Sequence, residues 1–268
     1  MTTNTYPHFE AVPLELHGHR KKLNYFFSSL EEYRSTQGIE PNQIHVVEVG
    51  CSNGRNIAMP IAERGYQVLG VDLHQPSIDY ANANNMFENA KFVCKDFAEF
   101  SSSEKFDVII LSDILEHVED PAFIANLAIE HLSENGLVLI CIPNGYGPYE
   151  NEQRFLRVTR LDKLLNSIKL FIKRILGRKV TKLAYNHDSG HIQFFHLKDF
   201  EALVQQVGLV IEDRTNGALF GGGFSYALGK LLPFIIRPSF NLADKLPPQW
   251  VSTWYFRCKL RKDIGVKL

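Results

Sequence analysis

The feature that most constrains the fold is an alternation of two kinds of apolar segment between residues 44 and 142. Five short runs rich in Val, Ile and Leu are separated by stretches with the apolar spacing of helices. Runs that are apolar on both faces are typical of strands in a parallel sheet covered by helices on both sides. The predicted strands are residues 44–49, 67–71, 91–94, 106–111 and 137–142.

The segments between and after these runs complete an α/β pattern. Asp120 is a candidate N-cap residue for the helix at residues 121–132, because Pro121 suits the first helical position. Gly208 ends a further helix and leads into a strand. We therefore expect a doubly wound, mostly parallel seven-stranded sheet. The remaining predicted elements are helices at residues 56–64, 77–84 and 197–207, and strands at residues 209–213 and 250–260.

Two segments do not belong to this alternation. Residues 19–37 predict a helix ahead of the sheet, which we assign to an N-terminal helical lid over the top of the domain. The second segment interrupts the sheet after its fifth strand and is strongly basic. The expected domains are a lid at residues 1–40, an α/β domain at residues 41–144 and 192–268, and an insertion at residues 145–191.

The insertion has the pattern of a basic amphipathic helix. Within residues 151–182, ten Lys and Arg side chains face only two acidic ones, Glu152 and Asp162. Apolar residues follow helical spacing over residues 161–179, so one face of that helix is apolar. Such a helix suits a cap over a binding site or contact with a membrane surface.

Charge and cysteine usage exclude several classes of protein. The chain has 29 basic and 30 acidic residues, a net charge of −1, so overall charge does not favour nucleic-acid binding. The four cysteines form no CxxC pair, which favours reduced thiols and a cytoplasmic location. There is no signal-peptide pattern and no apolar run of about 18 residues. We expect at most a peripheral contact with the inner face of a membrane.

The first predicted strand runs into a turn bracketed by glycines. Glu48 lies near the end of the strand, and Gly50 and Gly54 follow with three residues between them. Glycines at such a turn allow a ligand to approach the backbone amides at a helix start. The three-glycine fingerprint of dinucleotide sites is absent, so the turn disfavours a nicotinamide or flavin cofactor.

The second predicted strand ends in Asp72. A carboxylate at this sheet edge accepts hydrogen bonds from the hydroxyl groups of a ribose. The pattern therefore predicts a ligand that contains an adenosine ribose and needs no phosphate cradle.

Together these motifs resemble those of class I S-adenosylmethionine-dependent methyltransferases, and in particular the quinone-biosynthesis and related small-molecule group. The similarity covers residues 44–213. Beyond the glycine turn and Asp72, it is carried by the segments at residues 94–97, 106–118, 136–143 and 191–200.

The resemblance implies S-adenosylmethionine as cofactor and assigns residues to it. Glu48, Gly50 and Gly54 are expected at the methionine end, and Asp72 at the ribose. Asp96 and Phe97 are expected to border the adenine, and the predicted contacts of this site also include Cys51, Leu73 and Ser112.

Asp113, Glu116 and His117 follow the fourth predicted strand, and three interpretations stay open for them. They cap and pack the strand end, or His117 transfers a proton, or the three bind a divalent metal, as the corresponding residues do in some quinone and small-RNA members. We expect no metal. His117 and His191 are the candidate catalytic residues, because a histidine deprotonates an acceptor hydroxyl near neutral pH.

The predicted function is methyl transfer from S-adenosylmethionine to a small-molecule or lipid-linked acceptor, at oxygen. One alternative is a catalytically idle cofactor-binding module that acts at a membrane surface or on a protein partner. A dehydrogenase or epimerase is the third interpretation, and it lacks the dinucleotide fingerprint. Tyr146 and Tyr149 are expected on a flexible turn beside the acceptor. The sequence predicts neither the acceptor nor the oligomeric state.

Overall fold

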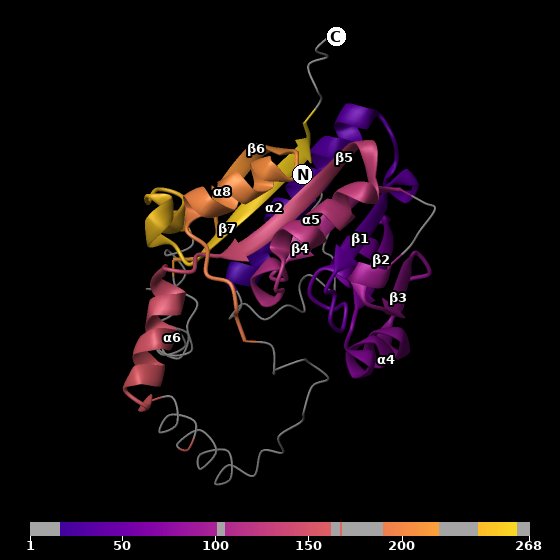
Figure 1. The fold of residues 1–268 in the computed structure, drawn as a ribbon. Helices are drawn as coiled ribbons and strands as arrows, with labels where there is room; N and C mark the ends of the chain where they lie inside the picture. Colours follow the sequence, from indigo (N-terminus) through magenta and orange to yellow (C-terminus); the bar gives the residue numbers. More distant parts are fainter. Residues whose placement is uncertain (1–16, 101–104, 162–166, 168–189, 220–240, 262–268) are drawn as a thin grey trace.

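The computed structural model describes residues 17–100, 105–161, 167, 190–219 and 241–261, and Figure 1 shows a central sheet between helical layers. The seven strands follow the order β3-β2-β1-β4-β5-β7-β6, and β7 is antiparallel to both of its neighbours. The predicted fold class is confirmed. The strands are β1 (His45–Val49), β2 (Gln67–Asp72), β3 (Ala90–Cys94), β4 (Phe106–Ser112), β5 (Leu132–Pro143), β6 (Leu209–Asn216) and β7 (Thr253–Leu260).

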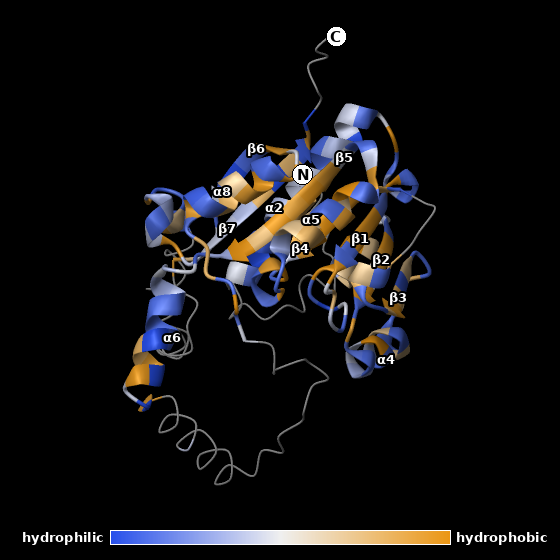
Figure 2. Ribbon diagram, in the orientation of Figure 1, coloured by the Kyte–Doolittle hydropathy of each residue, from blue (hydrophilic) through white to orange (hydrophobic). Residues whose placement is uncertain are grey.

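The central strands are apolar on both faces because helices cover both sides of the sheet. Val47 in β1 pairs with Leu69 on one side and Ile109 on the other. Neighbouring strand residues point to opposite faces, so each strand contributes to two separate cores. In Figure 2 the apolar residues are concentrated along β5, between these two helical layers.

Each face of the sheet has its own helical layer. One core contains residues of α2 (His17–Gln37), α3 (Ala58–Ala62) and α4 (Gln75–Asn84). The other contains residues of α5 (Pro121–Glu130) and α8 (Leu197–Gln206). The connections after β1 and β4 therefore cross to opposite faces. The carboxyl ends of β1 and β4 form the position at which doubly wound sheets bind ligands.

Within the predicted lid at residues 1–40, the described helix α2 packs against one face of the sheet. Leu23, Phe26 and Leu30 of α2 are fully buried in the core on one face of the sheet. Only the first turns of α2 reach the carboxyl ends of the strands, where Lys22 contacts Ser112. The apolar residues of α2 recur with helical spacing. That spacing is typical both of a helix packed on a sheet and of a helix that forms a lid.

Several predicted boundaries shift. Asp120 caps α5 as expected, because its side chain accepts a hydrogen bond from the Phe123 amide at 2.9 Å. The predicted helix at residues 56–64 is reduced to α3. The last strand begins at Thr253, three residues later than predicted, because a short 3-10 helix, Pro248–Trp250, precedes it.

A turn does follow β5, at residues 144–147, and Tyr146 lies in it, but Tyr149 lies in α6 (Pro148–Val158) instead of on the turn. Gly147 is the N-cap residue and Pro148 takes the first helical position, where no amide hydrogen is needed. The predicted basic helix at residues 161–179 lies outside the described residues except for Leu161 and Ser167. Among the described helices, none has both the length and the apolar character to cross a membrane.

His19 predicts a pH dependence of stability. Its Nε2 atom lies 2.8 Å from the Asn56 carbonyl oxygen, and burial, assisted by Lys22, lowers its pKa to about 4. In the unfolded chain a histidine has a pKa of about 6.5. Between pH 6.5 and pH 4 the unfolded chain therefore binds more protons than the folded protein, and stability decreases as pH falls. When the pH falls from about 7 to about 4.5, we expect the free energy of unfolding of His19→Gln to decrease by about 1 to 2 kcal/mol less than that of wild type. Urea unfolding at both pH values measures this, and equal losses would contradict it.

Candidate functional site

A cavity of about 630 Å³ lies at the carboxyl ends of β1 to β4. This volume lies within the range of small-molecule sites. The cavity has two parts, one around the turn after β1 and the ends of β2 and β3, and one around the segment after β4. Its lining includes Gly50, Ser52, Asp72, Leu73, Asp96, Phe97, Asp113, Glu116, His117, Tyr149 and His191.

The turn after β1 needs glycine at both predicted positions. Gly50 and Gly54 have φ values of +73° and +70°, which side chains rarely adopt. A Cβ atom on Gly50 would lie 2.8 Å from Ile114 Cδ1, and one on Gly54 would lie 2.4 Å from the Phe92 ring. Gly50 lines the cavity, whereas Gly54 permits close packing on β3.

Asp72 is held in place by two backbone amides. Its Oδ2 atom accepts a hydrogen bond from the Ser52 amide at 2.7 Å, and its Oδ1 atom accepts one from the His74 amide at 2.8 Å. Each carboxylate oxygen has a second lone pair, so Asp72 can still accept hydrogen bonds from a ligand in the cavity. The glycine turn and Asp72 are thus physically coupled.

The predicted adenine border also lines the cavity. Leu73 is 67% exposed, and Phe97 is buried and stacks on Phe100 with ring centroids 5.6 Å apart. Asp96 accepts a hydrogen bond from the Ala98 amide at 2.8 Å, which caps the short helix at Phe97–Glu99. An apolar surface bordered by a carboxylate suits a purine ring and its amino group.

Four predicted cofactor residues, Glu48, Cys51, Gly54 and Ser112, do not line the cavity. Glu48 is buried behind it, and burial raises its pKa well above the usual range. The Ser112 hydroxyl accepts a hydrogen bond from Lys22 Nζ at 3.0 Å and donates one to Asp113. Contact of these four residues with the cofactor stays a prediction.

The side chain of Lys22 in α2 reaches the end of β4, beside the cavity. Its Nζ atom lies 2.5 Å from Asp113 Oδ2. Burial disfavours the charge on Lys22, but the Asp113 carboxylate outweighs burial and raises the Lys22 pKa. Burial acts against the charge on Asp113 as well, and the Lys22 ammonium nevertheless holds the Asp113 pKa below its usual value. This ion pair ties α2 to the end of β4.

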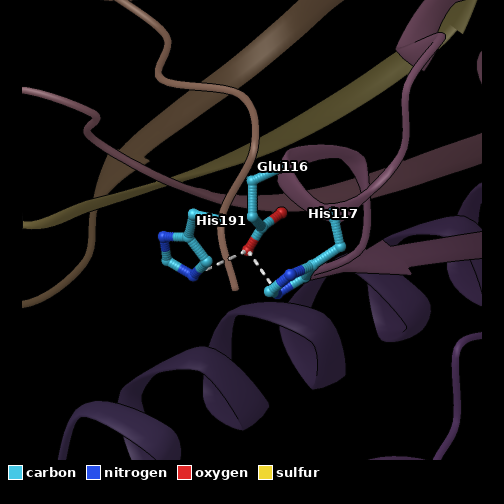
Figure 3. Close-up of side chains that lie close together, drawn as sticks. All are labelled: Glu116, His117 and His191. Atoms are coloured by element: carbon cyan, nitrogen blue, oxygen red, sulfur yellow. Dashed lines mark ion pairs between the residues drawn. The ribbon is translucent and has the colours of Figure 1, made fainter. Parts of the chain in front are cut away.

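Glu116, His117 and His191 form a cluster on the opposite wall, shown in Figure 3. One Glu116 oxygen lies 3.8 Å from His117 Nε2 and 4.0 Å from His191 Nε2. Glu116 is only 1% exposed, and neither of its carboxyl oxygens has a hydrogen-bond partner among the described residues. Burial, with the nearby Asp113 carboxylate, raises the Glu116 pKa well above its usual range.

Both histidines of the cluster are oriented through Nδ1. His117 Nδ1 lies 3.1 Å from the Gly190 carbonyl oxygen, and His191 Nδ1 lies 2.6 Å from a Glu150 carboxylate oxygen. Both partners accept hydrogen bonds, so Nδ1 carries the proton in each ring. The Nε2 atom of each ring is left for another partner.

This donor set fits a divalent cation. It consists of one buried carboxylate without a donor and two imidazole nitrogens, with all ligand atoms within 4.8 Å of one another. The set differs from the three residues considered in the sequence, because His191 joins it and Asp113 is paired with Lys22. Sequence reasoning did not identify Lys22 or Glu150.

The strand order, the glycine turn and the acid at the end of β2 define the class I S-adenosylmethionine-dependent methyltransferase fold. A family described as "Methyltransferase domain" matches residues 19–213, so the chain belongs to this methyltransferase family. The predicted resemblance and the predicted cofactor are confirmed.

Curated relatives include ubiquinone biosynthesis O-methyltransferases. That of Rickettsia canadensis is 27% identical over 51% of this chain and 66% of the relative. That of Rickettsia akari is 33% identical over 38% of this chain and 41% of the relative. The chain thus spans less than two thirds of either protein. For Hydrogenovibrio crunogenus the identity is 23%, over 78% of this chain and 85% of the relative.

Solved structures share the fold at low identity. Magnesium protoporphyrin IX methyltransferase from Synechocystis, with bound S-adenosylhomocysteine, has a TM-score of 0.53 at 14% identity, covering 94% of this chain and 88% of its own. A 1,6-didemethyltoxoflavin N1-methyltransferase from Burkholderia thailandensis has a TM-score of 0.51 at 13% identity, covering 88% and 77%.

Proposed function

We propose that the protein transfers the methyl group of S-adenosylmethionine to a hydroxyl oxygen of a small-molecule or lipid-linked acceptor. The observation that carries this proposal is one cavity with two chemically different walls. Gly50, Asp72 and Phe97 suit a nucleoside cofactor, and Glu116 with two histidines suits a group that loses a proton. A hydroxyl acceptor must lose its proton as the new bond to carbon forms.

The cofactor supplies an electrophilic methyl group on a sulfonium sulfur. The protein must then hold the cofactor and acceptor in line and keep water away. Asp72 orients the ribose, and the turn at Gly50 places backbone amides beside the methionine end. Leu73 and Phe97 enclose the base. These roles explain why the cofactor wall contains no acid–base pair.

On the acceptor wall, we propose that His117 and His191 are the catalytic residues, as the sequence predicted. The Nε2 atom of either ring can accept the proton that the acceptor hydroxyl loses. Glu116, His117 and His191 are also the residues that would hold a divalent cation. Such a cation would supply Lewis-acid stabilisation of the acceptor oxygen.

The choice of oxygen is supported by the ubiquinone O-methyltransferases among the relatives. The fold itself does not decide the acceptor atom, since the Burkholderia protein of the same fold is named as an N1-methyltransferase. The proposal of methylation at oxygen therefore depends more on the two histidines than on the fold.

The test is incubation with S-adenosylmethionine labelled in its methyl group, beside a lipid extract and an aqueous metabolite extract. We expect label in one extract and a matching amount of S-adenosylhomocysteine. No turnover with either extract, with cofactor binding intact, would favour the idle cofactor-binding module instead.

We further propose that the acceptor is lipid-linked and that α6 meets an anionic membrane surface. Phe155 and Val158 of α6 are 61% and 85% exposed, and Arg157 and Arg160 beside them are exposed as well. Exposed apolar residues next to basic ones suit the boundary between lipid headgroups and acyl chains.

Liposome flotation measures this contact. We expect the protein to float with anionic vesicles at low salt, and the double variant Phe155→Ser, Val158→Ser to lose at least half of the floating fraction. Val210→Ser, which removes an exposed apolar side chain from β6, is the matched control. Wild-type protein that stays soluble with anionic vesicles would favour a soluble acceptor.

A further inference from the structure

We propose that Lys22 is a positioning residue that acts on the cofactor through Asp113. By pairing with Asp113, it keeps the cavity wall beside the methionine end free of net negative charge. The site therefore gains no extra affinity for the positively charged sulfonium of S-adenosylmethionine over the neutral sulfur of S-adenosylhomocysteine. This role concerns the cofactor alone, so it holds whichever acceptor atom receives the methyl group.

Asp113 lies between the turn after β1 and the acceptor wall. It lines the same cavity as Gly50 and Asp72. Strands β1 and β4 are neighbours in the sheet, and a Cβ atom on Gly50 would lie 2.8 Å from Ile114 Cδ1, in the residue that follows Asp113. A cofactor that extends from Asp72 past Gly50 therefore brings its methionine end, with the sulfur, beside Asp113.

The backbone and side chain of Asp113 are both held in place. Its φ value is +54°, a conformation that few residues with a side chain adopt. Its amide donates a hydrogen bond to the Cys141 carbonyl oxygen at 3.0 Å, and its Oδ1 atom accepts one from the Cys141 thiol at 3.2 Å. Its Oδ2 atom lies 3.1 Å from the Ser112 hydroxyl and 2.5 Å from Lys22 Nζ. The carboxylate thus has one orientation.

Lys22 lies behind this carboxylate as seen from the cavity. The Lys22 side chain is 12% exposed, whereas that of Asp113 is 42% exposed. Asp113 lines the cavity and Lys22 does not. The Lys22 ammonium also donates a hydrogen bond to the Ser112 hydroxyl at 3.0 Å, which fixes it at the end of β4. A ligand in the cavity therefore meets the carboxylate, with the ammonium directly behind it.

This arrangement matters because the sulfur loses its positive charge as the methyl group leaves. An unpaired carboxylate beside the sulfonium would stabilise the reactant more than the transition state and would slow the transfer. The Lys22 ammonium opposes that attraction. The nearby carboxyl groups of Glu48 and Glu116 do not replace Asp113, because burial raises the pKa of each well above its usual range and keeps it uncharged near neutral pH.

The test is calorimetric measurement of the Kd for S-adenosylmethionine and for S-adenosylhomocysteine on the full chain without acceptor. The two ligands differ by one methyl group and its charge. Damage to the pocket weakens both, whereas a change of charge at Asp113 changes the ratio of the two Kd values. We expect Lys22→Met to shift this ratio toward S-adenosylmethionine by about fivefold to twentyfold.

The opposite shift is expected for Asp113→Asn, which leaves the Lys22 ammonium without its carboxylate. Each variant is compared with wild type at one pH: Lys22→Met at pH 8.5, which keeps the carboxylate ionised, and Asp113→Asn at pH 6.5, which keeps the ammonium protonated. The double variant removes both charges, so its ratio should return to within about twofold of wild type.

Two further variants separate charge from packing. Lys21→Met is the matched control, since it removes a neighbouring ammonium of α2 that pairs with Asp244 at 2.7 Å. Lys22→Arg keeps the positive charge. Both should keep the wild-type ratio within about twofold.

An unchanged ratio in Lys22→Met, a shift of the same sign in Lys22→Met and Asp113→Asn, or an equal shift in Lys21→Met would overturn the proposal. If Lys22→Met does not fold, Asp113→Asn decides, because the proposal requires its shift away from S-adenosylmethionine. No acceptor takes part in these measurements, so their failure would leave the proposed methylation at oxygen standing.

Discussion

Replacing His191 by Ala is expected to lower kcat by about 10²- to 10⁴-fold while leaving the Kd for S-adenosylhomocysteine within about twofold of wild type. His191 lies on the acceptor wall of the cavity, with Nδ1 at 2.6 Å from a Glu150 carboxylate oxygen. Its loss removes a group that acts on the acceptor hydroxyl and leaves the cofactor wall unchanged. Initial rates of S-adenosylhomocysteine formation and calorimetric titration measure the two quantities.

His45→Ala is the matched control for this experiment. His45 is exposed at the first residue of β1, at the opposite end of the strand from the cavity. We expect its kcat to equal that of wild type. A His191→Ala rate within about threefold of wild type would contradict a catalytic role and reduce His191 to a structural contact of Glu150.

The second large effect is expected at Asp72. Asp72→Ala should weaken cofactor binding by about tenfold to a hundredfold, because hydrogen bonds to a charged acceptor contribute roughly 1.5–3 kcal/mol. The variant also leaves the Ser52 and His74 amides without their acceptor, so Asp72→Asn is needed beside it. Calorimetry with S-adenosylhomocysteine measures both affinities.

Asp79→Asn provides the control, since Asp79 lies on the exposed face of α4, the helix that follows β2. An unchanged affinity in both Asp72 variants would mean that Asp72 only supports the turn after β1. The ribose would then need another partner on the cofactor wall.

The sheet was predictable because its central strands are apolar on both faces. Runs such as residues 106–111 have no polar face, and only a parallel sheet between two helical layers buries them fully. The glycine turn was predictable for a different local reason. The positive φ of Gly50 and Gly54 favours residues without a Cβ atom.

The acceptor wall was less predictable because long-range contacts build it. Glu150 meets His191 across 41 residues of sequence, and Lys22 meets Asp113 across 91. No local pattern reports such pairs. The sequence therefore included Asp113 among three possible metal ligands, whereas the structure pairs that carboxylate with an ammonium from the helix that packs on the sheet.

The helix α6 shows why a local signal was misjudged. Tyr149 was expected on a turn, although Gly147 and Pro148 before it suit the N-cap and first position of a helix. Only the packing of Glu150 and Leu156 shows that the helix forms. Because Glu150 belongs to α6, its role followed only from the structure.

A crystal structure of the protein with S-adenosylhomocysteine tests the central claim most directly. We expect the ribose hydroxyls within hydrogen-bond distance of the Asp72 carboxylate, the base between Leu73 and Phe97, and the sulfur facing Glu116, His117 and His191 across the cavity. A ligand bound elsewhere, or one whose sulfur faces away from that cluster, would contradict it.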